Sequence, residues 1–203
     1  MPKVTEERRV AVRTRILEAA LRVFLDKGLA ATSMADIIAE SGMSAGAIYG
    51  HFTNKAELTS QVAKIVVAGR IDLIEERLGH EPLPPPDVLL RDLFDTIPDE
   101  LLDSGLVLQI WGEAGPSGEL RQLAAEAFAT MGAAYGRYLT SWLVGQGHST
   151  RAARTQARKL TPAFIGVAQG YLVHRAVLGR DAAAAYLDSI DHLVRGCMWQ
   201  ARS

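Results

Sequence analysis

The sequence predicts an all-α protein of about nine helices, in which an N-terminal helix-turn-helix domain precedes a larger helical domain. Two observations predict this fold class. Apolar residues recur three and four positions apart over long stretches, as on one face of a helix. Glycine and proline interrupt these stretches, most clearly in GHEPLPPP at 79–86. We place the N-terminal domain at residues 1–54 and the C-terminal domain at residues 55–203.

The first predicted helix covers residues 8–27. Ile16, Ala20 and Phe24 follow one another at intervals of four and form one apolar row, and Gly28 ends the helix. This helix is expected to cover the backs of the next two. A domain of this size is marginally stable alone, so we expect it to pack against the helices of the C-terminal domain.

Two short helices are predicted within 32–58. Ser33 followed by Asp36 is a capping-box start, and Gly42 stands where a left-handed backbone ends a helix. Ser44 caps the second short helix. Two short helices joined by a glycine-containing turn form the helix-turn-helix arrangement, whose second helix lies in the major groove of DNA.

The open side of the second short helix carries small residues. Ile48 and Phe52 point inward, which leaves alanine and glycine facing outward, where they let the backbone approach a ligand closely. Asn54 and Glu57 cap a third helix, whose N-terminus is a ready anion site. The candidate DNA-binding residues are Thr32, Ser33, Ser44, Ala45, Gly46, Ala47, Tyr49, His51 and Lys55.

Residues 44–58, SAGAIYGHFTNKAEL, closely resemble the signature of TetR-like (TetR/AcrR family) transcriptional regulators. The similarity extends back through 16–20 and Phe24 to Gly28 and Thr32. It covers roughly the first 60 residues, and the remainder matches only in length and helical character.

The resemblance assigns roles to the candidate residues. It implies that Ser44 to Ala47 lie near base edges, and that five residues meet phosphates: Thr32, Ser33, Tyr49, His51 and Lys55. Two positions depart from the family pattern. Ile38 stands where the family often has alanine, and Ala45 stands where many members carry a long polar side chain, which removes one base reader.

Composition restricts the class of protein. The chain has 203 residues, a formal net charge of −1 and a single cysteine, Cys197, which excludes an intramolecular disulfide framework and suits a reducing cytosol. The N-terminus has no signal-peptide pattern and no apolar run reaches membrane-spanning length, so we expect a soluble, cytoplasmic protein without a membrane partner. Basic residues cluster near the start (Lys3, Arg8, Arg9, Arg13 and Arg15). This arm either contacts phosphate or a minor groove, or is a solvated, frayed terminus.

The C-terminal domain is predicted as a series of helices. The first, 55–78, links the two domains and is expected to act as a lever. Asp87 is expected to cap the next helix. The further helices are predicted at 87–95 with a continuation to 102, 106–113 (closed by a loop at 115–118), 119–144, 150–178 and 181–200.

The last two predicted helices are candidates for a dimer interface. Gly166 and Gly170 let two backbones approach, while Tyr186, Ile190 and Leu193 belong to an apolar stripe on the last helix. Such a helix pair favours a homodimer held by a four-helix bundle. The alternative is that the stripes are monomer core.

Aromatic residues of the middle helices suggest a small-molecule effector. Large aromatic side chains with few polar groups suit a hydrophobic or aromatic ligand. The candidate pocket residues are Phe94, Gln109, Trp111, Phe128, Met131, Tyr135, Trp142, Tyr171 and His174. The alternative is ordinary core packing, with His174 as a hydrogen-bonded core histidine.

No catalytic, metal-binding or cofactor motif is recognisable: metal-binding His-Glu patterns, a phosphate-binding glycine loop and Gly-x-Ser-x-Gly are all missing. The sequence therefore predicts a dimeric, ligand-responsive regulator rather than an enzyme, and a repressor in preference to an activator. It binds a palindromic operator and leaves it when the effector binds. The competing hypothesis is an all-helical sensor or interaction protein that has lost specific DNA binding.

Overall fold

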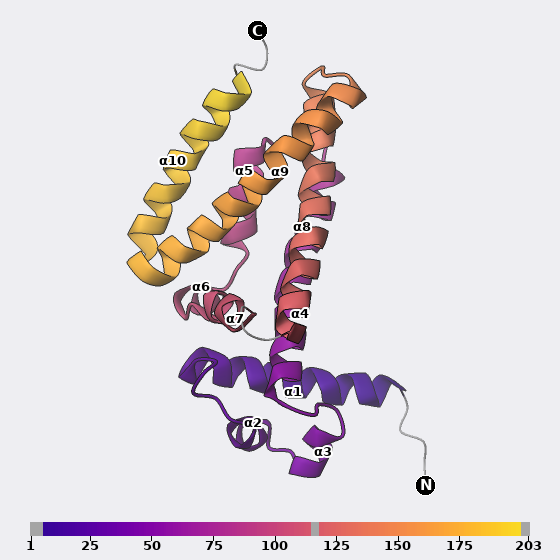
Figure 1. Cartoon of the computed structure of the whole chain (residues 1–203), viewed down its shortest axis with the longest axis vertical. Coiled ribbons are helices and arrows are strands. Elements are labelled where there is room, and N and C mark those ends of the chain that lie inside the picture. The colour runs from indigo at the N-terminus through magenta and orange to yellow at the C-terminus, as the bar shows by residue number, and fades with distance from the viewer. Residues whose placement is uncertain (1–5, 115–117, 200–203) are drawn as a thin grey trace. The chain divides into compact units, whose positions relative to one another are not determined.

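The regular secondary structure is helical within the residues that the computed structural model describes, 6–114 and 118–199 (Figure 1). The chain divides into two compact units. The first comprises residues 1–66 with 106–123, and the second comprises residues 67–105 with 124–203. The expected domain boundary at residue 54 stays a prediction. Lys3, the predicted loop residues 115–117 and Gln200 lie outside the described residues, as do the side chains of Cys197 and Met198.

The first unit is organised by α1, Glu6–Lys27. The apolar row Ile16, Ala20 and Phe24 is fully buried, which confirms the predicted inward face. Gly28 then reverses the chain with a φ of +77°, a conformation that is cheap only for glycine. The unit also contains α2 (Met34–Ser41), α3 (Ala45–Tyr49), the start of α4 (Lys55–Leu78) and α7 (Leu106–Ala114).

Helix α7 joins the first unit through one polar contact that the sequence pattern did not indicate. The side-chain oxygen of Gln109 accepts a hydrogen bond of 2.7 Å from the backbone N–H of Leu29. A Cβ added at Gly28 would lie 3.2 Å from the same oxygen, so glycine also makes room for this contact. The predicted helix at 106–113 is thereby attached to the turn between α1 and α2.

The second unit is a helical bundle around a continuous apolar core. Its elements are the remainder of α4, α5 (Pro86–Asp95), α6 (Asp99–Asp103), most of α8 (Gly118–Gly145), α9 (Thr150–Val173), a π-helical turn η1 (His174–Leu178) and α10 (Arg180–Trp199). Tyr138, Leu139 and Leu89 are fully buried at its centre. The predicted helix at 55–78 is confirmed as a single helix.

One local expectation in this unit was wrong, and one predicted helix has an irregular end. Asp87 does not cap α5, because Pro85 occupies the N-cap position and Pro86 the first helical position, where its missing N–H costs nothing. Asp87 instead lies in the first turn, where it is 4% exposed. The helix predicted at 150–178 is regular only to Val173 and then passes through the π-helical turn, which ends at Gly179 with a φ of +88°.

No helix within residues 6–114 and 118–199 combines the length and apolar character that crossing a bilayer requires.

Candidate nucleic-acid interface

The predicted capping box at the start of α2 is present. The Ser33 side-chain oxygen accepts a hydrogen bond of 3.2 Å from the Asp36 backbone N–H, and Asp36 Oδ2 accepts one of 2.8 Å from the Ser33 N–H. Lys27 Nζ donates to Asp36 Oδ1 at 2.6 Å. The hydrogen bond from Lys27, and then those from Ser33, hold the pKa of Asp36 well below its ordinary value. The carboxylate therefore stays charged at the positive end of the α2 dipole, where a negative charge is stabilising.

The turn between α2 and α3 fixes the orientation of α3. Gly42 adopts a left-handed conformation with φ +64° and ψ +17°, and its N–H donates to the Ala39 carbonyl. The Ser44 side-chain oxygen then accepts from the Ala47 N–H at 3.2 Å and caps α3. Ile48, on the inner face of α3, is fully buried. The helix-turn-helix predicted from the sequence is thus formed by its own local signals.

The outward face of α3 consists of small residues. Ser44, Ala45 and Gly46 are exposed, and Ala47 is half-buried. A Cβ added at Gly46 would meet no atom within 4 Å. Glycine at a helical position reduces stability relative to alanine, and no neighbour in the unit requires it here. The face is therefore open to close approach by another molecule.

Tyr49 is the last residue of α3, and His51 lies in the turn that follows it. The Tyr49 side chain is 51% exposed, whereas His51 is half-buried. Arg13 braces this end from α1: its Nη1 donates to the His51 carbonyl at 3.2 Å and its guanidinium lies 4.3 Å from the centre of the Phe52 ring. This part of the predicted basic arm is thus committed to holding α3 in place.

Besides Ser33, whose hydroxyl is held in the capping box, two of the predicted phosphate-binding side chains have partners inside the unit. The Thr32 hydroxyl, on a residue only 3% exposed, donates to the Gly28 carbonyl at 2.8 Å. Lys55 Nζ donates to the carbonyls of Leu29 and Thr32, each at 2.9 Å. Both side chains brace the loop between α1 and α2. A phosphate contact by either would require these hydrogen bonds to be exchanged.

The start of α4 is capped as the sequence indicated. Asn54 Oδ1 accepts from the Glu57 N–H at 2.9 Å, and Glu57 Oε2 accepts from the Thr53 N–H at 2.8 Å. The Glu57 carboxylate also accepts a hydrogen bond from the Thr53 hydroxyl. These contacts fix the segment that connects α3 to the long helix α4.

Three of the predicted pocket aromatics belong to the apolar core of the second unit. Phe94 and Tyr171 stack with ring centroids 3.9 Å apart. Tyr135 is 2% exposed, and its ring centroid lies 6.4 Å from that of Phe164. Burial raises the pKa of Tyr135 above its ordinary value.

The remaining predicted pocket residues are spread more widely. Met131 and Trp142 are partly buried against the core, while Phe128 is 37% exposed. His174 Nδ1 lies 2.7 Å from the Gly170 carbonyl, and its ring stacks on Tyr186. Gln109 and Trp111 belong to α7 and therefore to the first unit.

The sequence pattern missed Arg70, a residue of α4 with unusual surroundings. Its Nη1 donates to the Leu93 carbonyl at 2.7 Å and to the Thr96 hydroxyl at 2.6 Å, at the C-terminal end of α5. Its Nε is buried and has no hydrogen-bond partner. Burial lowers the pKa of Arg70. In the sequence, Arg70 is one charged residue within the apolar stripe of α4, and nothing in that pattern distinguishes it from a solvent-exposed arginine.

Comparison with known proteins places these features in a family context. Residues 16–62 match the family model described as "Bacterial regulatory proteins, tetR family". The chain is similar to the HTH-type transcriptional regulator TtgR of Pseudomonas putida, with 48% identity over 104 residues, 51% of this chain and 50% of TtgR. It is also similar to the HTH-type transcriptional regulator AcrR of Shigella flexneri, with 30% identity over 104 residues, 49% of this chain and 48% of AcrR. The chain spans about half the length of these curated relatives.

Solved structures extend the similarity in fold. A TetR-family regulator from Cytophaga hutchinsonii has a TM-score of 0.70 at 22% identity, covering 96% of this chain and 98% of its own. GusR of Salmonella enterica has a TM-score of 0.65 at 19% identity, with the same coverage. At these identities the likeness concerns the fold alone. The predicted fold class, all-helical with an N-terminal helix-turn-helix, is confirmed.

Proposed function

We propose that the protein is a cytoplasmic transcriptional regulator that acts as a repressor, because residues 16–62 match the TetR-family model and half of the chain is similar to a transcriptional regulator. In this proposal, a homodimer binds a palindromic operator and a small effector releases it. The two copies of α3 enter successive major grooves, roughly 34–36 Å apart. The observation that carries the DNA-binding role is the bare, outward face of α3, where Gly46 has no packing neighbour.

The roles at the interface follow from exposure. Ser44, Ala45 and Gly46 are exposed and lie closest to base edges in this proposal. Tyr49, 51% exposed, and the amides at the start of α2 supply phosphate contacts, which set register without reading sequence. Thr32 and Lys55 support the interface from behind through their bonds to the α1–α2 loop.

Replacing Gly46 with alanine should separate folding from DNA binding. We expect the free energy of unfolding to stay constant or to rise by up to about 1 kcal/mol, because the new methyl group meets no atom. We expect operator affinity to fall by about tenfold or more, comparable to one mismatched base pair, because the methyl group keeps α3 away from the groove. The operator is first obtained by selecting duplexes from random DNA, and affinity is then measured by fluorescence anisotropy at several salt concentrations.

Gly145→Ala is the matched control, since Gly145 is also a helical glycine with open space around it but lies at the end of α8, outside the residues proposed for either interface. It should leave operator affinity unchanged. Equal affinities of Gly46→Ala and the unaltered protein would contradict close approach by α3. If selection enriches no duplex even at low salt, the DNA-binding role is wrong and the sensor or interaction protein is the better hypothesis.

An apolar groove on the last two helices supports the homodimer. It measures about 250 Å³, and all of its lining residues are apolar: Leu90, Leu160, Ala163, Phe164, Val167, Ile190, Leu193 and Val194. Leu193 is 61% exposed at its edge. An apolar face of this kind on α9 and α10 suits a second copy of the same surface, which buries it about a two-fold axis.

The effector proposal rests on Phe94, Tyr135 and Tyr171 together with Arg70. Among the described side chains of the second unit, the other arginines that are at least half-buried pair with carboxylates: Arg77 with Asp92, Arg91 with Asp188 and Asp191, and Arg175 with Asp99 and Asp103. Arg70 has only neutral partners among the described residues, and its Nε has none. A buried donor without an acceptor costs about 1–3 kcal/mol. An aromatic effector carrying a carboxylate or another acceptor would remove that cost.

We expect an aromatic carboxylic acid to weaken operator binding more than its neutral amide does. Arg70→Met should abolish this difference while retaining operator binding in the absence of effector. The measurement is anisotropy of labelled operator at fixed protein with increasing acid or amide. By linkage, operator DNA must weaken effector binding by the same factor, which calorimetry checks independently. Operator affinity that is constant across a panel of aromatic acids and neutral aromatics would rule out the induction step.

A further inference from the structure

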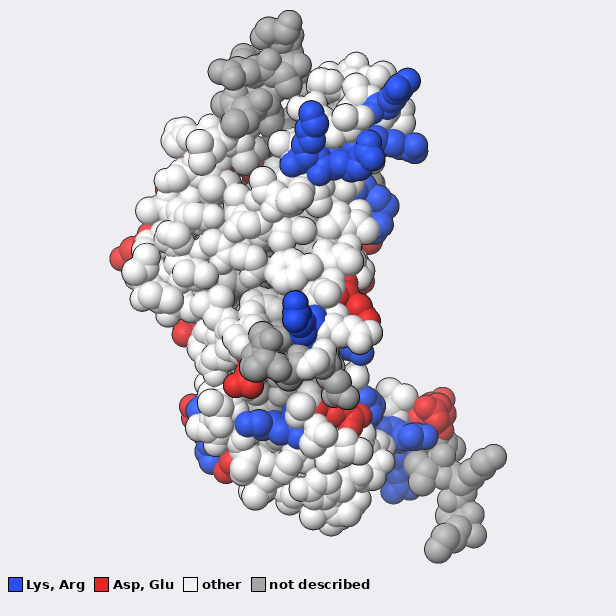
Figure 2. Space-filling view, viewed as in Figure 1, with Lys and Arg blue, Asp and Glu red and all other residues white. Residues whose placement is uncertain are grey.

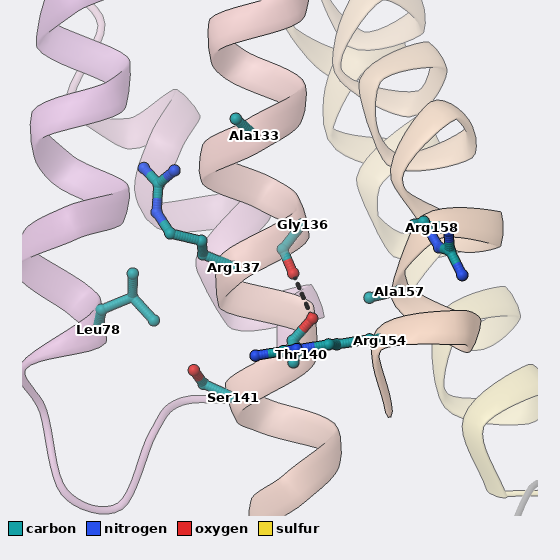
Figure 3. Close-up of a pocket in the computed structure, with 9 residues that line it drawn as sticks. All are labelled: Leu78, Ala133, Gly136, Arg137, Thr140, Ser141, Arg154, Ala157 and Arg158. Atoms are coloured by element: carbon teal, nitrogen blue, oxygen red, sulfur yellow. Dashed lines mark hydrogen bonds between the residues drawn. The ribbon is translucent and has the colours of Figure 1, made fainter. Parts of the chain in front are cut away.

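A groove between α8 and α9 carries charges that neither the DNA interface nor the apolar face uses. It measures about 700 Å³ and lies within the second unit (Figure 3). Its walls include Arg137 and Ser141 from α8 and Arg154 and Arg158 from α9. Small residues leave it open at the centre, among them Gly136. We propose that this groove binds a small, multiply charged anion of the phosphate or polycarboxylate class.

The two arginines of α9 are the uncompensated charges of the groove. Arg137 pairs with Glu75 of α4, so its charge is already balanced. Arg154 and Arg158 are exposed and make no ion pair within the described part of the chain. In Figure 3, the Arg154 side chain extends from α9 toward α8, where Thr140 lies. Guanidinium groups are the side chains best suited to hold phosphate and carboxylate oxygens, because their donors match these oxygens in pairs.

Ser141 adds a hydroxyl donor at the same groove. The Thr140 hydroxyl is occupied, because it donates to the Gly136 carbonyl at 2.7 Å. The Ser141 hydroxyl, in contrast, makes no hydrogen bond among the described residues and its side chain is exposed. An anion held by Arg154 and Arg158 would therefore find a neutral donor on the opposite wall.

The charge around the groove is one-sided over a long part of the chain. No aspartate or glutamate occurs between Glu126 and Asp181, while that segment contains seven lysines and arginines. The whole chain nevertheless has a net charge of −1. Figure 2 shows Lys and Arg side chains gathered over the end of the second unit where α8 and α9 meet. The positive potential is thus local and adds to the attraction of an anion.

The start of α9 violates two ordinary preferences of helices. Arg151 and Arg154 lie near its N-terminus, where the helix dipole favours negative charge. Arg154 and Arg158 are four residues apart, so two like charges stem from the same side of the helix, a spacing that is unfavourable for like charges. Both effects are unfavourable in the free protein, and a bound anion reverses both. Departures from local preference of this kind are expected at functional positions.

The groove is separate from the proposed dimer face. Arg158 and Leu160 are two residues apart on α9, so their side chains point to nearly opposite sides of the helix. Leu160 lines the apolar groove, and Arg158 lines the charged one. The anion site is therefore compatible with dimerisation and does not depend on the DNA-binding proposal.

Calorimetric titration of the full chain tests the site. Pyrophosphate and citrate serve as probes, and sodium chloride maintains constant ionic strength. We expect saturable binding with one anion per chain, and a loss of about tenfold or more in affinity for Arg154→Gln/Arg158→Gln, which removes two charge-assisted contacts. Arg151→Gln/Lys159→Gln removes the same charge from the same helix outside the groove, and should reduce affinity much less.

Three different results of these titrations would contradict the proposed anion site. Equal losses in the two double variants would mean general attraction by α9 rather than a site. Absence of saturable binding by either probe would exclude the site. If Arg154→Gln/Arg158→Gln instead weakened binding of a duplex of arbitrary sequence and neither probe bound, the surface would be a nucleic-acid contact and the small-anion site would be wrong. Thermal unfolding of each variant without probe confirms that both fold, as the exposed positions of all four residues lead us to expect.

Discussion

Replacing Leu193 with glutamate should convert the proposed dimer into monomers and lower operator affinity by about 100-fold or more. Leu193 is 61% exposed at the edge of the apolar groove, so the monomer tolerates the change. In the proposed dimer the same carboxylate would be buried twice against apolar side chains, where an unpaired charge is very costly. A monomer also loses the effective concentration that joins two half-sites, which is typically worth about 10²–10⁴ in affinity.

Sedimentation equilibrium and operator anisotropy measure the two effects together. Val144→Glu is the matched control, because Val144 is an exposed apolar residue of α8 that does not line the apolar groove. It should leave both mass and affinity unchanged. A Leu193→Glu protein that remains dimeric would show that α9 and α10 do not form the interface. A monomer with full operator affinity would contradict symmetric recognition of a palindrome.

Gly170→Ala should destabilise the second unit by about 1–3 kcal/mol through overpacking between α9 and α10. A Cβ at this position would lie 2.7 Å from Cζ of Tyr186 and closer still to its hydroxyl oxygen, which no real contact allows. Tyr186 cannot move away freely. Its hydroxyl donates to the Val167 carbonyl at 3.1 Å, and its ring stacks on His174 with centroids 4.3 Å apart.

Urea unfolding of the full chain, followed by circular dichroism, provides the measurement. Gly166→Ala, one helical turn earlier, should be neutral or stabilising, since its Cβ meets nothing. In a Tyr186→Ala background, Gly170→Ala should lose most of its cost, because the clashing ring is gone. A cost that persists in that background would mean that Tyr186 is not the cause.

The features that the sequence predicted correctly are those set by neighbours along the chain. The capping box of Ser33 and Asp36, the left-handed Gly42 and the Ser44 cap all involve residues within four positions of one another. The apolar row of α1 and the continuous helix α4 follow from periodicity. Local chemistry of this kind can be read without knowing what packs against it.

The features that the sequence did not reveal depend on distant partners. The inward hydrogen bonds of Thr32 and Lys55 arise because the α1–α2 loop folds back onto α1 and the start of α4. Gln109 reaches Leu29 across 80 positions. The incomplete hydrogen bonding of Arg70 is visible only once α5 is placed beside α4. A pattern in one dimension identifies these residue types but not their partners.

The continuity of α4 bears on how an effector would act. Residues up to Val66 belong to the first unit and those from Val67 onward to the second, yet no break separates them. Arg70 stands only four residues beyond Val66, about 6 Å along the helix axis. In the proposed function, a displacement of Arg70 by an effector would therefore reach the unit that carries α3 through little more than one turn of α4. In the proposed function, a stiff turn at this point of α4 would strengthen the coupling between effector binding and operator binding, and a flexible turn would weaken it.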